Sequence, residues 1–475
     1  MLGKYFQWHK SINTVKLPMK LITNKLQIPA PLQILQFVFN PISWMEACAQ
    51  RYGDIFMVKL NQPEVWVSNP EALKQILAND NQDFRLLKNG NMVFEPILGR
   101  HSVITVSGDE HHHQRQLLMT KLHGNRMRTY GQVMSQVTEE VISQWLVSKP
   151  FCIQSQIQSI TLKVIMQAVL GSHKGKQAEE LETSLVLMLD HIRSSPYKVL
   201  QLYFPFLQKD LGAWSPWGKF IRCKAKVDRL LYAEIEENLK KSDESRTDIL
   251  SLLIAAKDKN GESMTCEELR DELITLLIVG HETTATAIVW ALYWIHKIPR
   301  VKEKLLLEIN SLGKFFKPSN VLQLPYLNAV CNETLRIYPL RMLTFPRVVE
   351  NRISLCGYEL EPGTVVTGCI YLVHQREDLY TNHWQFNPER FLEKQYSPYE
   401  FIPFGGGERL CIGMAFAQFE MKVVLATILA NCQLDLVTNT NILPQRDGLV
   451  TGPNCLIEMV MKRRLQSESN FLAKI

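Results

Sequence analysis

The glycine-rich stretch from Phe404 to Gly413 contains residue types that can hold a metal through sulfur. Cys411 stands just ahead of a segment with helical character, 414–421, where backbone N–H groups and the helix dipole stabilise a thiolate and lower its pKa. Arg409 adds a cation that suits a carboxylate partner. Glycines let the backbone turn tightly and approach a flat ligand. The stretch therefore predicts a reactive or metal-binding thiolate beside such a ligand.

Other interpretations of this loop can be tested by spacing. A dinucleotide-binding fingerprint that starts at Gly405 would need glycine at position 410, where Leu410 stands. A phosphate-binding loop would need Gly-Lys-Ser/Thr, which the stretch lacks. A nucleophilic cysteine and a buried structural cysteine both stay open at this point, because no local catalytic signature decides between them.

A second polar motif, 280–284, interrupts a long apolar helical pattern. Thr265 and Glu268 have the spacing of a capping box, and the pattern stops before Pro299, which predicts a helix of about 30 residues. The helix is apolar on most sides and should be buried, so its polar centre costs free energy unless it is satisfied. A zinc-protease motif is excluded because Ala285 stands where the second histidine would be needed.

Two charged pairs have helical spacing. Glu333 and Arg336 lie three residues apart, and His111 and Arg115 lie four apart, so each pair shares a helix face. A carboxylate and a guanidinium group tolerate burial only when they are paired. The adjacent residues 112 and 113 are also histidines, but consecutive helix positions point in different directions. We therefore expect His112 and His113 to be surface or packing residues.

These residues must be positioned by a mainly α fold. The 475 residues are 46% hydrophobic, enough for a large core, and the net charge of +6 is too mild to indicate nucleic-acid binding. Long helical patterns dominate, and no segment resembles a hinge. Short strand-like runs could pair into one small sheet beside the helical body; they are 55–60, 65–67, 352–355, 358–360 and 364–366.

Cysteine usage and the N-terminus bear on location. None of the ten cysteines forms a Cys-x-x-Cys pair, and most lie in apolar surroundings, so we expect reduced core residues and a cytoplasmic protein. Residues 1–28 form a basic segment without a secretory pattern. We interpret it as a frayed tail, with a peripheral membrane contact as the alternative. No run of 18 apolar residues predicts a transmembrane span.

The loop from Phe404 to Gly413 reads F-G-x-G-x-R-x-C-x-G and resembles the haem-binding loop of the cytochrome P450 superfamily. Further segments match motifs of that family in order along the chain; they are His111 to Arg115, Gly280 to Thr284, Glu333 to Arg336 and Pro388 to Phe391. The resemblance implies a cytochrome P450 fold with a long central helix, formed by a single haem domain over residues 29–475. It is closest in character to the soluble bacterial branch.

The resemblance also implies roles for individual residues. Cys411 would be the axial ligand to the iron of haem b, and Thr283 with Glu282 would deliver protons during oxygen activation. Glu333, Arg336 and Arg390 would form a structural triad that supports the haem loop. Cofactor contacts are expected at His111, Arg115, Gly280, Arg347, Phe404, Gly405, Arg409 and Gly413.

The substrate pocket should be apolar. Family position suggests lining residues, with ordinary core packing as the alternative for each; they are Ile97, Leu98, Val279, Leu343, Thr344, Phe345, Thr451 and Gly452. Many family members have alanine at the position of Val279, and the β-branched side chain would narrow the space above the haem. Similarity to bacterial members favours a long-chain fatty acid or a terpenoid as substrate.

The expected activity is that of a haem-thiolate monooxygenase, which inserts one oxygen atom from O2 into a C–H bond. Only a short stretch follows Cys411, so electrons from NAD(P)H should arrive through a separate reductase and a ferredoxin- or flavodoxin-type donor. We interpret Lys121 and Lys422 as plain surface lysines, with docking of an acidic donor as the alternative. Two other classes stay open: a haem-thiolate isomerase or peroxygenase, which the Glu282-Thr283 pair disfavours, and a non-catalytic haem sensor.

Overall fold

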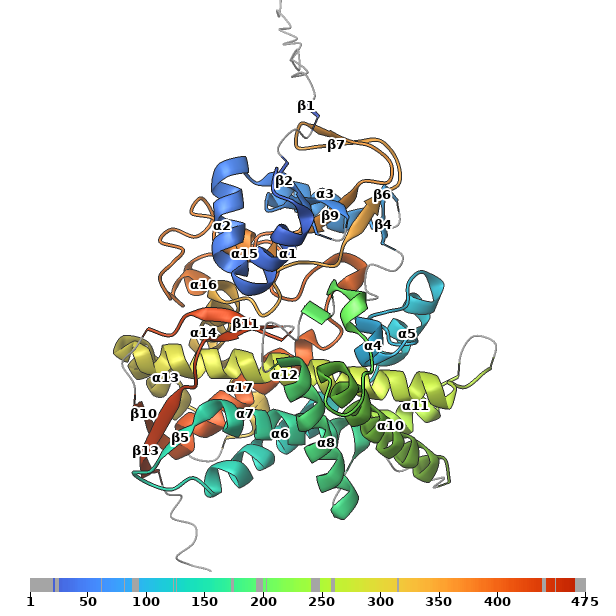
Figure 1. Ribbon diagram of the computed structural model, residues 1–475. Coiled ribbons are helices and arrows are strands. Elements are labelled where there is room, and N and C mark those ends of the chain that lie inside the picture. Colours follow the sequence, from blue (N-terminus) through green and yellow to red (C-terminus); the bar gives the residue numbers. More distant parts are fainter. Residues whose placement is uncertain are drawn as a thin grey trace, which may run out of the picture.

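The computed structural model describes residues 20–21, 25–60, 62–80, 82–87, 94–122, 124, 126–171, 175–193, 200–201, 203–240, 248–257, 261–313, 316–437, 441–448 and 450–465. Helices fill most of the molecule, and most of the strands gather in a smaller part at one end (Figure 1). The prediction of a mainly α fold with a small β-rich part is confirmed.

The long central helix is α12, Cys266–Lys297, which crosses the middle of the helical body (Figure 1). Its first turn has the predicted capping box: the Glu268 N–H donates to the Thr265 hydroxyl at 3.2 Å, and the Thr265 N–H donates to the Glu268 carboxylate at 2.7 Å. The next helix, α13 (Pro299–Asn310), begins at Pro299. Both predicted boundaries are therefore confirmed.

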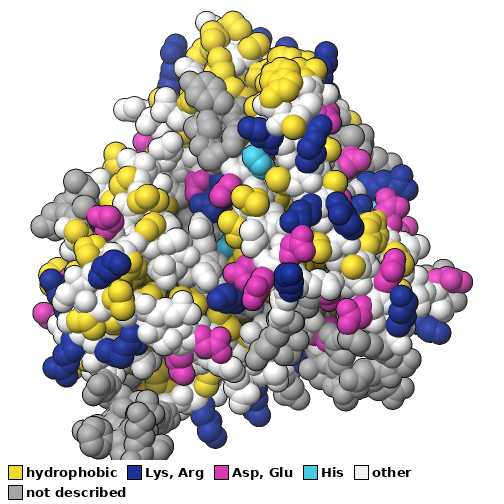
Figure 2. All heavy atoms as spheres, turned by 60° about the horizontal axis from the view of Figure 1, so that its bottom comes forward, with side chains coloured by type: hydrophobic (Ala, Val, Ile, Leu, Met, Phe, Trp, Pro, Cys, Tyr) yellow, Lys and Arg dark blue, Asp and Glu magenta, His cyan; other side chains and the backbone are white. Residues whose placement is uncertain are grey.

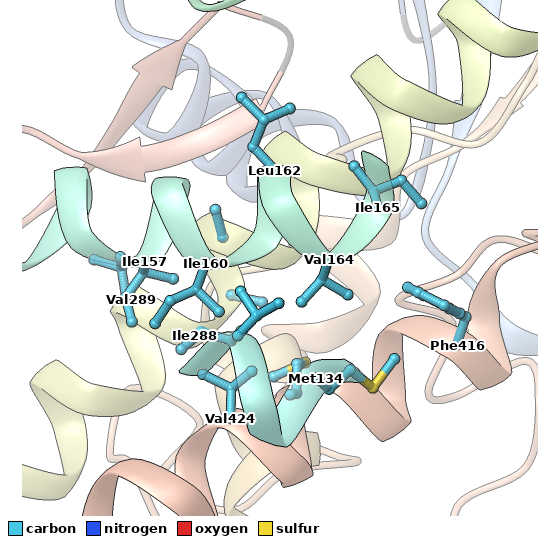
Figure 3. Packing of buried hydrophobic residues seen from close by; sticks show 14 of the residues in the cluster. Met134, Ile157, Ile160, Leu162, Val164, Ile165, Ile288, Val289, Phe416 and Val424 are labelled. Carbon is cyan, nitrogen blue, oxygen red and sulfur yellow. The ribbon is translucent and has the colours of Figure 1, made fainter. Parts of the chain in front are cut away.

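The core of the helical body forms where α7 (Ile153–Leu170) packs along α12. Ile157, Ile160 and Val164 recur at helical spacing and face Ile288 and Val289 of α12 (Figure 3). Helices α6 (Arg126–Ser143) and α17 (Met414–Asn431) close the same core. Full burial of each such side chain contributes roughly 1.5–3 kcal/mol, so this packing holds α12 firmly in place.

The β-rich part contains a five-stranded sheet in the order β2-β3-β9-β6-β4. Its strands are β2 (Ile55–Lys59), β3 (Pro63–Val67), β9 (Val365–Gly368), β6 (Arg347–Val349) and β4 (Phe84–Leu86). The prediction of a single small sheet is wrong in one respect. Strands β7 (Ile353–Leu355) and β8 (Tyr358–Leu360) pair with β1 (Lys20–Leu21) in a separate sheet.

Two more strand groups lie among the helices. Strands β10 (Cys432–Leu436), β13 (Glu458–Arg464) and β5 (Pro150–Cys152) form one sheet, and β11 (Pro444–Asp447) pairs with β12 (Val450–Pro453) in a hairpin. Further helices are α1 (Ala30–Phe39), α2 (Pro41–Tyr52), α3 (Pro70–Ala78), α4 (Glu95–Leu98), α5 (Asp109–Met119), α8 (Lys176–Arg193), α10 (Pro216–Lys240), α11 (Ile249–Ile254), α14 (Pro325–Ile337), α15 (Ile370–His374) and α16 (Arg390–Glu393).

The cysteines are less buried than predicted. All ten are free thiols, but only Cys48, Cys331, Cys369 and Cys432 are buried. Cys266, Cys356 and Cys455 are exposed, because they lie at the start of a helix or in loops. The expectation that most of the cysteines belong to the core is therefore wrong, and their reduced state stays a prediction.

The N-terminal and membrane predictions are tested only in part. Residues 1–19 and 22–24 of the basic segment lie outside the described residues. Two described helices, α12 and α17, are long and apolar enough to cross a membrane, but 78% and 67% of their most apolar windows are buried inside the protein. They are better explained as core helices.

On the face in Figure 2, positive and negative side chains are intermingled.

Candidate active site

One face of α12 borders solvent-accessible space in the middle of the helix. Val279 is 36% exposed, and Gly280 and Thr283 are partly exposed, whereas the flanking Ile278 and Glu282 are buried. Positions 279, 280 and 283 share one helix face. The Thr283 hydroxyl donates to the Val279 carbonyl at 2.7 Å, which holds it at this opening with its lone pairs free to accept a proton donor.

The structure explains by packing why glycine stands at position 280, which the sequence alone did not show. A Cβ atom at this position would lie 2.9 Å from Cδ1 of Ile165 on α7. Glycine therefore lets α7 approach α12 closely. The predicted contact of Gly280 with a cofactor stays a prediction.

Cys411 lies three residues before α17 in a loop that presents its sulfur half-buried. Its N–H donates to the Phe404 carbonyl at 3.0 Å. Burial raises the pKa of the Cys411 thiol, while the N–H of Gly413 and the guanidinium groups of Arg115 and Arg341 act to lower it. The prediction that the pKa of Cys411 is lowered is therefore wrong for the thiol without a metal. Desolvation raises this pKa by more than the N–H groups at the start of the helix lower it. Metal coordination would deprotonate the thiol outright.

Cys411 interacts electrostatically with Arg115, which in turn interacts with two further basic side chains, His111 and Arg409. His111 Nδ1 and Arg409 Nε are buried and lack a hydrogen-bond partner within the described part of the chain. Burial and the charges of Arg409 and Arg115 lower the pKa of His111 to about 3, so its ring is neutral. A Cβ at Gly413 would meet open space. These features fit a flat ring group whose carboxylates take up the unused donors.

The donor set also fits the iron of a haem better than a bare metal ion. Across the described residues, no group of three or more histidine, cysteine, aspartate or glutamate side chains could hold a metal. A haem needs only one strong protein ligand on the side of Cys411, because the porphyrin supplies the others. The residues present therefore fit haem b, with Cys411 as the protein ligand.

Arg409 is held by the segment that precedes α5. Its guanidinium group donates to the carbonyl of Val103 at 2.7 Å and to the carbonyl of Val106. These bonds leave Nε as the unused donor. Burial lowers the pKa of Arg409 to about 10, so the group stays charged at neutral pH. A propionate contact through Nε stays a prediction that this geometry allows.

Arg347 forms an ion pair with a carboxylate that the sequence did not indicate. Its Nε and Nη2 donate to Asp80, both at 3.0 Å, and Nη2 also donates to the Gly406 carbonyl. The Asp80 carboxylate accepts the Glu408 N–H at 2.8 Å as well. A Cβ at Gly407 would lie 2.0 Å from Asp80 Oδ2, so glycine is required there. Arg347 thus ties the haem loop to the β-rich part.

The structure brings Glu333, Arg336 and Arg390 together in a buried cluster. Arg336 donates two bonds to the Glu333 carboxylate, at 2.7 and 2.8 Å, and one to the His374 carbonyl at 2.8 Å. Arg390 Nε donates to the same carboxylate at 3.1 Å. The Asn387 N–H also donates to this carboxylate, at 2.9 Å. The carboxylate therefore joins α14 to the segment that leads into the haem loop.

Glu282 belongs to a network that the sequence did not predict. Its buried carboxylate lies 2.8 Å from the Arg193 guanidinium group, which also contacts Asp447 at 2.9 Å. Burial raises the pKa of Glu282 to about 8, and Asp447 and Asp190 raise it further, against the opposing effect of Arg193. Glu282 can therefore hold a proton at neutral pH and release it near the opening at Thr283.

The raised pKa of Glu282 predicts how stability depends on pH. The folded state binds the proton more tightly than the unfolded chain, whose pKa is near 4.5. Compared with Glu282→Gln, the wild type should therefore lose a few kcal/mol of unfolding free energy as pH rises from about 5 to about 8. Urea unfolding of both proteins across this range measures the difference. Glu458→Gln, an exposed site, should show no such trend, and parallel curves for Glu282→Gln would contradict the assignment.

The predicted substrate-lining residues divide into two groups. Val279, Leu343 and Phe345 are partly or fully accessible and can line a pocket. The others are buried, and their part in lining a pocket stays a prediction; they are Ile97, Leu98, Thr344, Thr451 and Gly452. The hydroxyl of Thr344 accepts the Gly368 N–H at 3.0 Å, so this residue holds the neighbouring segment in place.

The histidine and lysine predictions have mixed outcomes. His112 is exposed, as expected, and lies 2.9 Å from Glu408. Lys422 is buried with 8% exposure, so its predicted part in docking a redox partner is wrong. It lies on a face of α17 that packs inward. Lys121 is half-buried, and its part in docking a redox partner stays a prediction.

Comparison with known proteins shows the family to which the chain belongs. The family model for cytochrome P450 matches residues 25–457. The putative cytochrome P450 135B1 of Mycobacterium tuberculosis is 30% identical over 90% of this chain and 89% of its own, and the putative cytochrome P450 138 of that organism is 28% identical over 92% and 95%.

A solved structure shows the same fold. The retinoic acid-bound cyanobacterial CYP120A1 has a TM-score of 0.81 at 22% identity and covers 94% of this chain and 100% of its own. The family match spans nearly the whole chain and includes Cys411, the α12 motif and the buried triad. The chain therefore belongs to the cytochrome P450 family.

Proposed function

We propose that this monooxygenase inserts one oxygen atom from O2 into a C–H bond of a hydrophobic small molecule, a long-chain fatty acid or a terpenoid. Electrons would come from NAD(P)H through a separate ferredoxin- or flavodoxin-type donor. The observation that carries the haem-thiolate chemistry is the half-buried Cys411 sulfur beside the unused donors of His111 and Arg409.

The chain's own residues prepare the site for this reaction. When bound, the haem supplies oxygen activation, which a cysteine thiolate ligand favours. The Cys411 sulfur would hold the iron, and the donors of His111 and Arg409 would bind the carboxylates of the porphyrin. Val279 and its apolar neighbours exclude water from the reacting carbon. Thr283 and Glu282 would hold and pass protons at their hydroxyl and carboxyl oxygens.

Thr283→Ala tests the proton-delivery role. Removing the hydroxyl should lower product formed per NAD(P)H consumed by about tenfold or more and release peroxide instead, because proton delivery loses its relay. Parallel measurement of NAD(P)H, peroxide and product gives the coupling. Thr183→Ala is the matched control, since Thr183 makes the same bond to the carbonyl four residues earlier, at 2.8 Å, away from the site. Equal coupling in wild type and Thr283→Ala would contradict the role.

Turnover with defined electron sources tests the function as a whole. We expect oxygenated product when the protein is supplied with NAD(P)H, a reductase and a ferredoxin or flavodoxin. Product formed only with added peroxide would indicate a peroxygenase instead. Ligand or gas binding without product under any electron supply would indicate a haem sensor.

We also propose that residues 29–475 act as one haem domain in the cytoplasm, with a peripheral membrane contact through the basic segment 1–28. Pairing between distant strands supports a single domain. Strand β13 near the end of the chain pairs with β5, and β3 pairs with β9. Such long-range pairing leaves no obvious boundary between independent units.

A further inference from the structure

Two arginines, Arg341 and Arg446, are largely withdrawn from solvent and lack an acidic partner. Neither guanidinium group forms a salt bridge within the part of the chain that the structure describes. Arg446 Nη2 donates to the Phe37 carbonyl at 3.2 Å, but its Nε is buried without a hydrogen-bond partner among those residues. Withdrawing a cation from water is costly unless an anion compensates for it.

The backbone brings the two arginines to neighbouring segments. Arg446 on β11 lies opposite Thr451 on β12 in the hairpin. The Thr451 N–H donates to the carbonyl of Leu340 at 3.0 Å, and Arg341 is the next residue. The Trp290 indole N–H of α12 donates to the Thr451 carbonyl at 3.2 Å. The arginine pair is therefore held in a defined place beside the central helix.

Aromatic rings are the main neighbours of both charges. The Arg341 guanidinium carbon lies 4.7 Å from the ring centroid of Phe345 and 5.4 Å from that of Phe94. The Arg446 guanidinium carbon lies 4.6 Å from the centroid of Phe37. Cation–π contacts of this kind contribute about 0.5–2 kcal/mol each, which offsets only part of the desolvation. They orient the guanidinium groups and leave most of their donors unused.

The electrostatics indicate that an anion is missing. Burial lowers the pKa of Arg341, and the positive charge of Arg446 lowers it further, so the two groups lie close enough to repel each other. Burial also lowers the pKa of Arg446. The groups that oppose these effects are the Tyr203 phenol and the Cys411 thiol, and neither is a carboxylate.

The haem propionates are a less suitable partner for this pair. The unused donors of His111 and Arg409 already form a separate set, in which Arg409 interacts electrostatically with Arg347 and Arg115. Arg341 interacts with Arg446 and Tyr203 but also with Cys411, and it shares the Phe345 ring with Arg409, so it lies near the haem loop. Arg446, on the β11–β12 hairpin, interacts with Tyr203 and not with Arg409, so only one member of the pair lies near the set that suits the propionates.

We infer that Arg341 and Arg446 together bind the carboxylate of the substrate, which makes the substrate an apolar carboxylic acid. The planar guanidinium group matches a carboxylate with two parallel hydrogen bonds, and a second arginine can share the same charge. The apolar part of the molecule would lie against Leu343, Phe345 and Val279, which are accessible. The inference rests on the proposed function, because it concerns the substrate of that site.

Binding of matched acids and alcohols tests the inference. Dodecanoate, hexadecanoate and abietate are each titrated against the corresponding primary alcohol, with the spin-state change of the ferric haem as readout. At least one acid should bind wild type about tenfold or more tightly than its alcohol, as expected for hydrogen bonds to charged groups. Arg341→Gln and Arg446→Gln should each remove most of this preference. Arg341→Lys should keep part of it, because the charge remains while the two-pronged geometry is lost.

The control is Arg352→Gln, which removes an exposed arginine paired with Glu361 and should leave the acid preference unchanged. The inference is overturned if every alcohol binds as tightly as its acid, including the case in which none of them binds. It is also overturned if the preference survives both glutamine variants, or if Arg341→Gln loses its haem while Arg446→Gln keeps the preference, which would assign Arg341 to the cofactor. Failure of the proposed function is distinguishable, because it would appear as absence of oxygenated product with NAD(P)H, a reductase and a ferredoxin or flavodoxin, whereas the acid preference is measured by binding alone.

Discussion

Replacing Cys411 with serine is expected to abolish the red-shifted Soret band of the reduced carbon monoxide complex and to reduce oxygenated product to background. Serine cannot provide the thiolate electron density that favours O–O cleavage. The substitution is nearly isosteric, and the Cys411 side chain is only half-buried, so the fold should survive. The carbon monoxide difference spectrum and product analysis on the same preparation measure both effects.

Cys455→Ser is the matched control for this experiment, because Cys455 is an exposed free thiol in a loop. It should have the wild-type spectrum and turnover. If instead the red-shifted band persisted in Cys411→Ser, another residue would have to hold the iron, and the assignment of the haem ligand would be wrong.

Arg336→Ala is expected to cost about 3–5 kcal/mol of unfolding free energy, a large part of the roughly 5–15 kcal/mol available to a typical protein. The fully buried Glu333 carboxylate would lose two hydrogen bonds, and the His374 carbonyl would lose its donor. Because this cluster supports the segment leading to the haem loop, haem retention should fall as well. Urea unfolding and the haem-to-protein ratio measure the two effects.

The exposed pair of Arg352 and Glu361 provides the contrast. Arg352→Ala should change the unfolding free energy by no more than about 1 kcal/mol, because water and salt screen a surface ion pair. Arg336→Lys should also be destabilising, since an ammonium group cannot replace the two parallel hydrogen bonds. Comparable small losses for Arg336→Ala and Arg352→Ala would show that the buried cluster is not a main support of the fold.

Features that depend on local sequence could be predicted well. The start of α12 depends on Thr265 and Glu268, which are three residues apart, and its end depends on Pro299. Both signals lie within one turn of the boundary that they set. The same holds for the glycine-rich loop around Cys411, whose motif is continuous in sequence.

Features that depend on distant pairing could not be predicted. Strands β7 and β8 were expected in the same sheet as β9, but their partner is β1, more than three hundred residues earlier in the chain. The direction of the pKa shift of Cys411 was also predicted wrongly. Burial depends on the whole fold, whereas the effect of the helix N-terminus depends only on the residues that follow Cys411.

The candidate site shows the same division. The ionic partners of Glu282 and Arg347 were missed, because Arg193, Asp447 and Asp80 lie far from them in sequence. Arg341 did leave a signal. It is a single charge within the apolar stretch 339–346, and a charge that interrupts a buried segment calls for an explanation.

The contact between Gly407 and Asp80 has a consequence for how this protein can evolve. Any side chain at position 407 would collide with the Asp80 carboxylate, and a shorter residue at position 80 would leave the buried Arg347 without its anion. Either change would disrupt the ion pair that ties the loop to the β-rich part. We therefore expect the residues at positions 80, 347 and 407 to be inherited together, because a change at one of them requires changes at the others.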